Sequence, residues 1–460
     1  MARLAQPSAR PARPATEFSM TSSLSTLFKP VKPEQWAHAK KWSLRLIEIG
    51  LVQGLVQFLT ALTGLLIVRT LAKQDYAVYA ITNSMQAAAN ILADLGISLG
   101  VRSIGGRVCE DRQRYGQLLN SALKLRGWFA TVSLGVTVPI AAWMLWRNGA
   151  SWALTLALCL TIVASLTPLL ASSIWITSLQ LHGQYRRLQK IDLSNAALRL
   201  MMIGGLMFSY LSALTAALTV VVSNWVQLIW LKKHAVELAD TRQPPNAEDI
   251  RELKKLSFKM LPNSIFFCLQ SQITVWLITV FGNVNNVADV SALGRISMLF
   301  LVLHTTMDMI VMPRFSRIQE PNLLFRRYAV LIFGCLVVSS LALIAAALFS
   351  TQFLWLLGPK YSHLKPELIL VMLSAVTNFV AGTMWGVNVS RAWIKAAPLY
   401  IPVTLATQVL VLLVLDVSTV RGVLWFGFWS LVPSLFLNGF SAWTGFRQLF
   451  QKGGLVPVKI

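Results

Sequence analysis

The sequence has little charge, and very little acid, for its length. Only 13% of its 460 residues are charged, and 18 acidic residues stand against 41 Lys and Arg. A soluble protein of this size needs more charge to cover its surface. Hydrophobic residues make up 55% of the chain, and its mean hydropathy is +0.60. This composition predicts a polytopic helical membrane protein, whose apolar runs of about 20 residues each cross a bilayer.

Several chemical signatures are missing as well. The four cysteines form no CxxC pair or other metal-ligand spacing, so we expect neither a metal nor a cofactor. No GxxxxGK[ST] motif is present to hold nucleotide phosphates. The chain start lacks the apolar run of a cleaved signal peptide. The net charge of +23 does not predict nucleic-acid binding, because the Lys and Arg lie between apolar segments.

A charged stretch divides the apolar segments into two equal sets. We predict an all-α integral membrane fold with twelve transmembrane helices in two six-helix bundles around a central cavity. The bundles cover 46–231 and 260–446, joined by a linker at 232–259 and flanked by a disordered basic N-terminus at 1–45 and a tail at 447–460. The spans lie near 46–68, 76–100, 127–146, 152–178, 193–210, 213–231, 260–281, 289–312, 328–350, 364–388, 397–415 and 422–445.

Lys and Arg alternate loop by loop in a way that predicts the orientation. With both termini in the cytoplasm, the cytoplasmic segments hold 34 of the 41, including all six in 102–126, and the outward loops hold six. The remaining one, Arg295, falls inside a span. Cytoplasmic loops carry an excess of Lys and Arg, so this distribution supports both the span count and a multi-pass protein with cytoplasmic termini. The outward loops are too short to hold a folded domain.

Polar and small side chains form stripes in the first two spans of each half. Spacings of three, four and seven residues share one face of a helix. Polar groups inside a membrane usually face protein or a water-filled cavity, so we predict that these four helices line a hydrated cavity. Hydrogen bonding between helices is the alternative for each residue. The stripes are Gln53, Gln57, Thr60 and Gly64; Asn83, Gln86, Asn90 and Asp94; Asn263, Gln270 and Thr274; and Ser291, Arg295 and Thr306.

Two charges lie well inside predicted spans, Asp94 and Arg295. An Arg at that depth needs a carboxylate, water or an anionic ligand. Arg295 therefore predicts an anion site, and a structural ion pair between Arg295 and Asp94 is the alternative.

Further titratable groups lie within or near spans. His304 and Asp308 share a face of the eighth span, opposite Arg295. Together with Asp94 they are the candidates for ion coupling, because His titrates near neutral pH; a packed, hydrogen-bonded pair is the alternative. Asp192 and Arg199 lie near span ends, where we expect their side chains to reach the interface.

Four short motifs resemble those of a known family. The chain reads VRTLAKQDYAVY at 68–79, LQLHGQYR at 179–186, MPRFS at 312–316 and WLLGPKY at 355–361. Their order and spacing resemble the polysaccharide-transport branch of the multidrug/oligosaccharidyl-lipid/polysaccharide exporter superfamily, the O-antigen flippase type. Ala77 departs from the pattern, which usually has Gly there. The peptidoglycan-precursor branch typically has fourteen spans. The drug-exporter branch usually has a coupling acid in its first span, where this chain has only Glu48 at the membrane edge.

The resemblance implies a flippase that exports an undecaprenyl-diphosphate-linked oligosaccharide across the bacterial inner membrane by alternating access. Its partners would be this substrate, membrane lipids and polysaccharide assembly proteins. Arg295 would attract the diphosphate at depth, and arginines at the cytoplasmic mouth would capture it first: Arg45, Arg102 and Arg107. The sugar hydroxyls would bind to Gln53, Gln57, Asn90 and Asp94.

Two other functions remain open. An ion-coupled drug or small-metabolite exporter would use the same fold. A membrane-embedded polysaccharide polymerase or ligase is the weaker alternative, because such enzymes need a large outward loop with catalytic residues, and no acidic pair or Ser/His/Asp grouping invites catalysis. We therefore expect a transporter rather than an enzyme.

Overall fold

The computed structural model describes residues 33–307, 311–312, 315, 318 and 320–451. By its internal contacts the chain divides into two units, residues 1–48 and 49–460. Of the first unit, the structure describes the start of helix α2. This helix begins at Pro33, inside the segment 1–45 that the sequence predicts to be disordered, so the helical part reaches further toward the N-terminus than expected.

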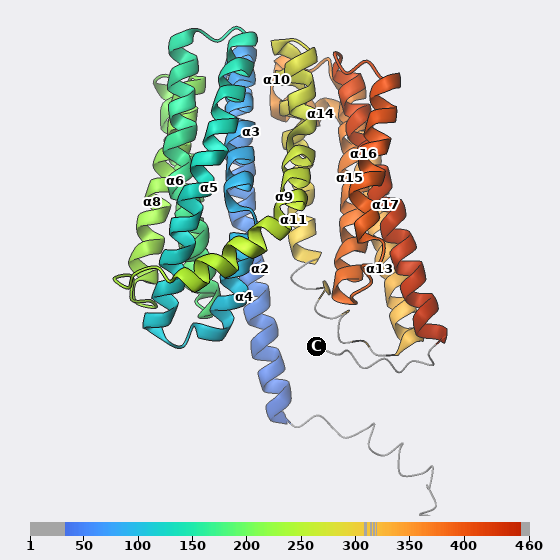
Figure 1. The fold of residues 1–460 in the computed structure, drawn as a ribbon. Coiled ribbons are helices and arrows are strands. Elements are labelled where there is room, and N and C mark those ends of the chain that lie inside the picture. The colour runs from blue at the N-terminus through green and yellow to red at the C-terminus, as the bar shows by residue number, and fades with distance from the viewer. Residues whose placement is uncertain (1–32, 308–310, 313–314, 316–317, 319, 452–460) are drawn as a thin grey trace, which may run out of the picture. The chain divides into compact units, whose positions relative to one another are not determined.

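All regular structure in the described residues is helical (Figure 1). The helices are α2 Pro33–Thr70, α3 Lys73–Asp94, α4 Ile97–Val108, α5 Arg112–Arg147, α6 Trp152–Leu181, α7 Tyr185–Phe208, α8 Ala213–Ala235, α9 Ala247–Phe281, α10 Val284–Ser297, α11 Leu299–Thr306, α13 Pro321–Leu348, α14 Ser350–Leu357, the 3-10 turn η2 Pro359–Tyr361, α15 Lys365–Ser390, α16 Ala397–Val414 and α17 Val420–Gln451.

Ten of the described helices are long and apolar enough to cross a membrane, and the bent pair α3–α4 makes eleven. This confirms an all-α membrane protein. The span predicted near 289–312 is divided, because α10 ends at Ser297 and α11 has only eight residues. Neither alone has the roughly 20 residues that a crossing needs. Twelve spans in two six-helix bundles therefore stay a prediction.

Local sequence explains where helices begin and bend. Ser212 caps α8 in a capping box with Thr215, which satisfies backbone N–H groups at the helix start. Between α3 and α4, Leu95 and Gly96 have positive φ angles of 40° and 80°, a conformation that Gly adopts without steric cost. The helix axis bends by 42° there. The bend falls directly after Asp94, so the carboxylate sits at a break in the predicted span.

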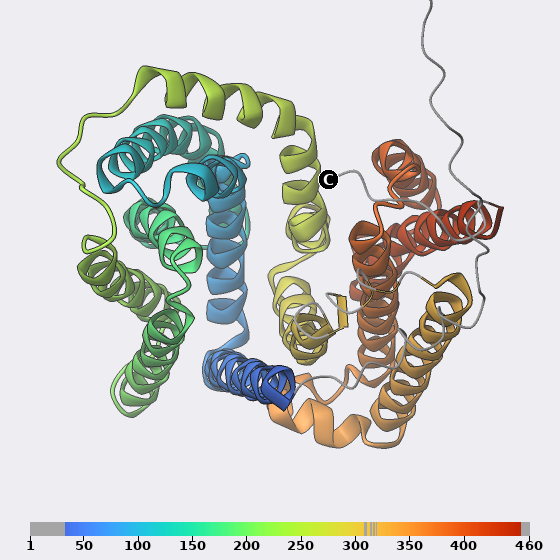
Figure 2. The ribbon, with the colours of Figure 1, turned by 90° about the horizontal axis from the view of Figure 1, so that it is seen from below.

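Helices α3, α10 and α15 connect the early and late parts of residues 49–460. Helix α3 packs against α5, α6 and α8, while α15 packs against α13 and α17. Helix α10 contacts both α3 and α15, and Figure 2 shows these helices side by side in the end-on view. One hydrophobic core includes Tyr76 of α3, Val287 of α10 and Phe379 of α15. A continuous apolar core thus runs through the three helices.

The outer surface of several helices carries large apolar side chains. On α13, Phe333, Leu341 and Leu348 are 69%, 61% and 72% exposed. Soluble proteins rarely expose such contiguous apolar surface, whereas lipid tails cover it without penalty. This exposure agrees with helices that face a bilayer.

Candidate functional site

Arg295 lies in the last turn of α10, where it meets α2 and α3. Its Nε donates to the hydroxyl oxygen of Tyr76 (3.3 Å), and its Nη1 lies 3.9 Å from the Met298 sulfur. A Cβ built on Gly64 of α2 would lie 3.4 Å from the same Nη1, so the guanidinium rests against the α2 backbone. Within the described part of the chain, no carboxylate pairs with Arg295. Among the described residues, Arg295 is therefore held by a hydroxyl and a thioether and not by an opposite charge.

Two fully buried tyrosines link Arg295 to a second arginine. The Tyr76 hydroxyl donates to the Ser291 carbonyl oxygen (3.2 Å) while it accepts from Arg295. Its ring lies 6.4 Å from that of Tyr79, measured between centroids, and the Tyr79 hydroxyl accepts from Nη2 of Arg199 (3.2 Å). We call Arg199, Tyr79, Tyr76 and Arg295 the arginine–tyrosine cluster. Both cations in it are bound by neutral hydroxyls.

Arg199 departs from the prediction that its side chain reaches the membrane interface. It is half-buried and reaches Tyr79 on α3 instead. A buried, hydrogen-bonded arginine costs less than an isolated one but remains an expensive group inside a membrane. Sequence position alone did not reveal this, because Arg199 lies close to the predicted start of its span.

Asp94 pairs with Arg126 of α5 and not with Arg295. The Arg126 side chain is 2% exposed and donates to the Ser98 hydroxyl (2.6 Å), to Ser173 and to the Leu170 carbonyl. The prediction that Arg126 lies in a cytoplasmic loop is wrong, because α5 begins at Arg112 and carries it into the helix interior. The predicted alternative of an Asp94–Arg295 pair is also wrong.

The amide groups of the α2 and α3 stripes are half-buried and available. Gln53, Gln57 and Asn90 form no hydrogen bond with another described residue. In a membrane such amides need water, lipid headgroup or ligand partners. Their predicted role in binding a polar substrate therefore stays open.

The stripe on α9 hydrogen-bonds to neighbouring helices. Gln270 exchanges two hydrogen bonds with Gln408 of α16 (3.0 and 2.8 Å), and Gln408 also donates to Ser430 of α17 (3.2 Å). The Thr274 hydroxyl lies against Gly427 of α17. For Gln270 these bonds support the alternative that its polar side chain joins helices together, and cavity lining stays a prediction.

The predicted capture arginines differ in their surroundings. Arg102 is exposed and donates to the Gln180 side chain (3.0 Å). Arg107 forms an exposed ion pair with Glu252 (3.2 Å), so part of its charge is neutralised. The side chain of Arg45 lies outside the described residues.

The ion-coupling candidates are only partly described. His304 of α11 is half-buried and packs on Gly382 of α15, where an added Cβ would lie 2.3 Å from its Nε2. Asp308 lies outside the described residues. The third candidate, Asp94, is held by Arg126. Proton or ion coupling through these groups stays a prediction.

A cluster of charges ties the α2–α3 turn to α10 and η2, at the end of the helices predicted to face outward. Lys73 Nζ lies 2.8 Å from Asp289 Oδ1, and His363 Nε2 lies 3.5 Å from Asp289 Oδ2. The Lys360 amine donates to the Leu71 carbonyl. Burial lowers the pKa of Lys360, and the nearby charge of Lys73 lowers it further. We call Lys73, Asp289 and His363 the outward latch.

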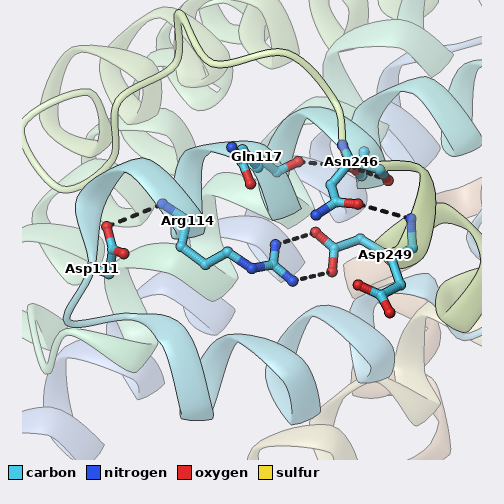
Figure 3. Close-up of polar contacts among 7 residues, drawn as sticks. Asp111, Arg114, Gln117, Asn246 and Asp249 are labelled. Atoms are coloured by element: carbon cyan, nitrogen blue, oxygen red, sulfur yellow. Dashed lines mark hydrogen bonds and ion pairs between the residues drawn. The ribbon is translucent and has the colours of Figure 1, made fainter.

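The linker is fastened to α5. Arg114 binds Asp249 through two nitrogens (2.5 and 2.6 Å), and the Asp249 side chain is 2% exposed (Figure 3). Asn246 caps α9 by accepting from the Glu248 backbone N–H (2.8 Å). In the same loop, hydrogen bonds from the Gln243 side chain and the Arg242 backbone lower the pKa of Asp240. The linker is thus ordered and packs against α5.

A pocket of about 460 Å³ is lined by residues that precede α13, such as Phe315, and by residues of α13, such as Arg326 and Leu331. It does not include Arg295, so the central cavity stays a prediction. No His, Cys, Asp and Glu group suited to a metal occurs among the residues that the structure describes.

This arrangement of helices is that of known membrane transporters. No protein-family model and no curated protein matches the chain. Solved structures match the chain over most of its length. Their sequence identities to it are low, so the match shows a shared fold only. The protein therefore has the fold of MATE transporters of the MOP superfamily.

Three structures illustrate the match. An inward-facing multidrug resistance MATE transporter gives a TM-score of 0.62 at 13% identity, covering 86% of this chain and 95% of that one. An outward-facing MATE transporter gives 0.54 at 18% identity, with coverages of 89% and 94%. A MOP superfamily transporter from Pyrococcus furiosus, described as having a binding pocket of reverse polarity, gives 0.51 at 15% identity, with coverages of 88% and 94%.

Proposed function

We propose that this protein is a flippase, which moves an undecaprenyl-diphosphate-linked oligosaccharide from the cytoplasmic to the outer leaflet of the bacterial inner membrane. The MATE-like fold supports transport by alternating access. The four motifs that resemble the polysaccharide-transport branch support this substrate class. The observation that carries the proposal is that Arg295, inside a predicted span, has no carboxylate partner among the described residues.

The diphosphate is the part of such a substrate that a bilayer resists most. An arginine fork donates in pairs to phosphate oxygens. Arg295 uses its Nε on Tyr76, and its charge lacks a carboxylate partner among the described residues. A cation inside a membrane span marks a functional site by default. Arg295 is therefore the proposed diphosphate ligand, with Arg199 as a second charge behind the two tyrosines.

Half-buried amides supply the proposed sugar contacts. Gln53 and Gln57 of α2 and Asn90 of α3 carry amide donors and acceptors that match hydroxyl groups, and none of them bonds to another residue that the structure describes. We remove Asp94 from the proposed sugar-binding set, because Arg126 and Ser98 already occupy its carboxylate. Arg102 remains the best described candidate for first capture, since Arg107 is engaged by Glu252.

Two observations favour a state open toward the cytoplasm. The outward latch joins α3 to α10 at the end predicted to face outward, and the inward-facing MATE structure has a higher TM-score than the outward-facing one. The linker is bound to α5. We therefore propose that the two predicted halves rock against each other about a point after the linker, near Pro262 inside α9. An ion gradient is the proposed energy source.

Replacing Arg295 in a deletion strain tests the proposal. We expect Arg295→Ala to leave the lipid-linked sugar trapped on the inner leaflet and to reduce surface polysaccharide at least tenfold, while Arg295→Lys keeps part of the export. Arg421→Ala is the matched control, because Arg421 is exposed and pairs with Glu367, and neither residue belongs to the arginine–tyrosine cluster. Normal polysaccharide export by Arg295→Ala would refute the anion-binding role.

A drug or small-metabolite exporter is the second candidate, favoured by the similarity to multidrug resistance MATE structures. The same deletion strain separates the two functions. Drug sensitivity with normal surface polysaccharide would support the exporter and end the flippase proposal. Loss of polysaccharide with unchanged drug resistance would support the flippase.

A further inference from the structure

The first half of α9 carries basic side chains on a single face. A helix turns about 100° per residue, so positions three, four, seven and eight apart lie together. Arg251, Lys254, Lys255 and Lys259 follow this spacing, and all four are exposed. We call these four residues the basic face of α9.

The opposite face of this helix is fixed to the protein. Leu253 is fully buried and packs so closely on α4 that a Cβ on Gly100 would lie 2.5 Å from its side chain. Ser257 is 1% exposed, and Asp249 is held by Arg114. The buried side therefore holds the basic face in one orientation, so its four charges are presented together.

The charges of the basic face are unopposed within the described residues. None of the four pairs with a carboxylate there, and the one acidic residue in 251–259, Glu252, is bound by Arg107. Lys254 lies over the rings of Trp128 (5.7 Å) and Phe258 (5.9 Å). These rings belong to side chains that are 55% and 52% exposed. Exposed aromatic rings beside cations are typical of the membrane–water interface.

We propose that the basic face of α9 binds the phosphates of anionic lipid headgroups. The same helix continues directly into the apolar segment predicted to span the membrane from residue 260, which sets Lys259 and its neighbours at the level of the headgroups. Clusters of four or more Lys and Arg next to a span attract anionic lipid, at about fivefold in affinity per residue. This inference does not depend on which substrate the protein transports.

The test uses the full chain in nanodiscs of phosphatidylcholine that carry spin-labelled phosphatidylglycerol or spin-labelled phosphatidylcholine. The fraction of immobilised spin label gives the preference for the anionic lipid. We expect the preference to fall several-fold in a variant with Arg251→Gln, Lys254→Gln, Lys255→Gln and Lys259→Gln. The matched control removes the same charge from four other exposed residues by Lys190→Gln, Lys232→Gln, Lys233→Gln and Arg242→Gln, and keeps the preference.

Wild-type protein gives an independent measurement that needs no variant. Phosphatidylglycerol in the nanodisc is expected to slow acylation of Lys254, Lys255 and Lys259 by an amine-reactive reagent at least threefold, with little effect on Lys190. Inorganic phosphate added to pure phosphatidylcholine nanodiscs should give no such protection. An unchanged lipid preference in the α9 variant, an equal loss in the control, or equal protection by free phosphate would each overturn the proposal.

Discussion

Asp94 of α3 and Arg126 of α5 form an ion pair in which the arginine is nearly inaccessible and the carboxylate is partly open. The pair explains how a chain with few acidic residues keeps one arginine neutralised among apolar helices. Because Arg126 holds Asp94, this carboxylate does not pair with Arg295, which has no carboxylate partner among the described residues. In the proposed mechanism, Arg126 has a structural role and Arg295 binds the substrate.

The two substitutions that break this pair should lower the free energy of unfolding by different amounts. Asp94→Asn leaves Arg126 charged and buried, and we expect a loss of about 3–5 kcal/mol in the free energy of unfolding. Arg126→Met leaves a carboxylate that is 31% exposed and still accepts from Ser98, so its cost should be smaller. Thermal unfolding in detergent compares the two variants.

The exposed pair Arg107–Glu252 is the control for that comparison. Its side chains are 66% and 58% exposed, and surface pairs of this kind contribute about 0–1 kcal/mol. Glu252→Gln should therefore leave the melting temperature nearly unchanged. A larger effect from Arg126→Met than from Asp94→Asn would contradict the assignment of Arg126 as the buried partner.

The close approach of Arg295 to α2 predicts a size limit at Gly64. Gly64→Val would push the guanidinium away from its position beside Tyr76, and we expect transport to fall at least tenfold. Gly54→Val on the same helix meets no atom within 4 Å and controls for helix propensity. Export assays in the deletion strain measure both; equal activity of the two variants would show that the position of Arg295 does not matter.

The outward latch predicts a bias in conformation. Asp289→Asn removes the charge that Lys73 and His363 share, so opening on the predicted outward side should become several-fold more frequent. Ser291→Cys, two residues away on α10, reports it through labelling by a membrane-impermeant maleimide added from outside. Asp416→Asn in the loop before α17 serves as control, since the hydrogen bonds that the Asp416 carboxylate forms within the described residues are with Ser418. If the labelling rate does not change, the outward latch does not control opening on that side.

The linker contact predicts local rather than global unfolding. Asp249→Ala frees the Arg114 side chain and the start of α9, so tryptic cleavage after Arg242 should speed up at least fivefold. The rest of the chain should keep its melting temperature within a few degrees. Glu248→Ala, at an exposed neighbouring position, is expected to leave the cleavage rate as it is. Equal protection of Arg242 in all three proteins would show that the Arg114–Asp249 contact does not order the linker.

Several features of this protein were readable from the sequence because they depend on local properties of the chain. Apolar runs of bilayer length predicted the membrane-spanning helices, and their polar breaks predicted the linker. Arg295 was identified as an intramembrane cation because no polar segment surrounds it. Helix spacing also placed the amides of Gln53 and Gln57 on one face of a helix, and Asn90 on the polar face of the next.

The partners of the polar groups were decided only by the tertiary structure. Periodicity gives the face of a helix but not which neighbour covers it, so the sequence left open whether Gln270 lines a cavity or joins helices, and only the structure shows its bond to Gln408. Arg126 looked like a loop residue because hydropathy marks the apolar part of a helix and misses its polar beginning. Asp94 found Arg126 rather than Arg295 because α3 packs on α5 along its length, and that packing is a property of the whole fold.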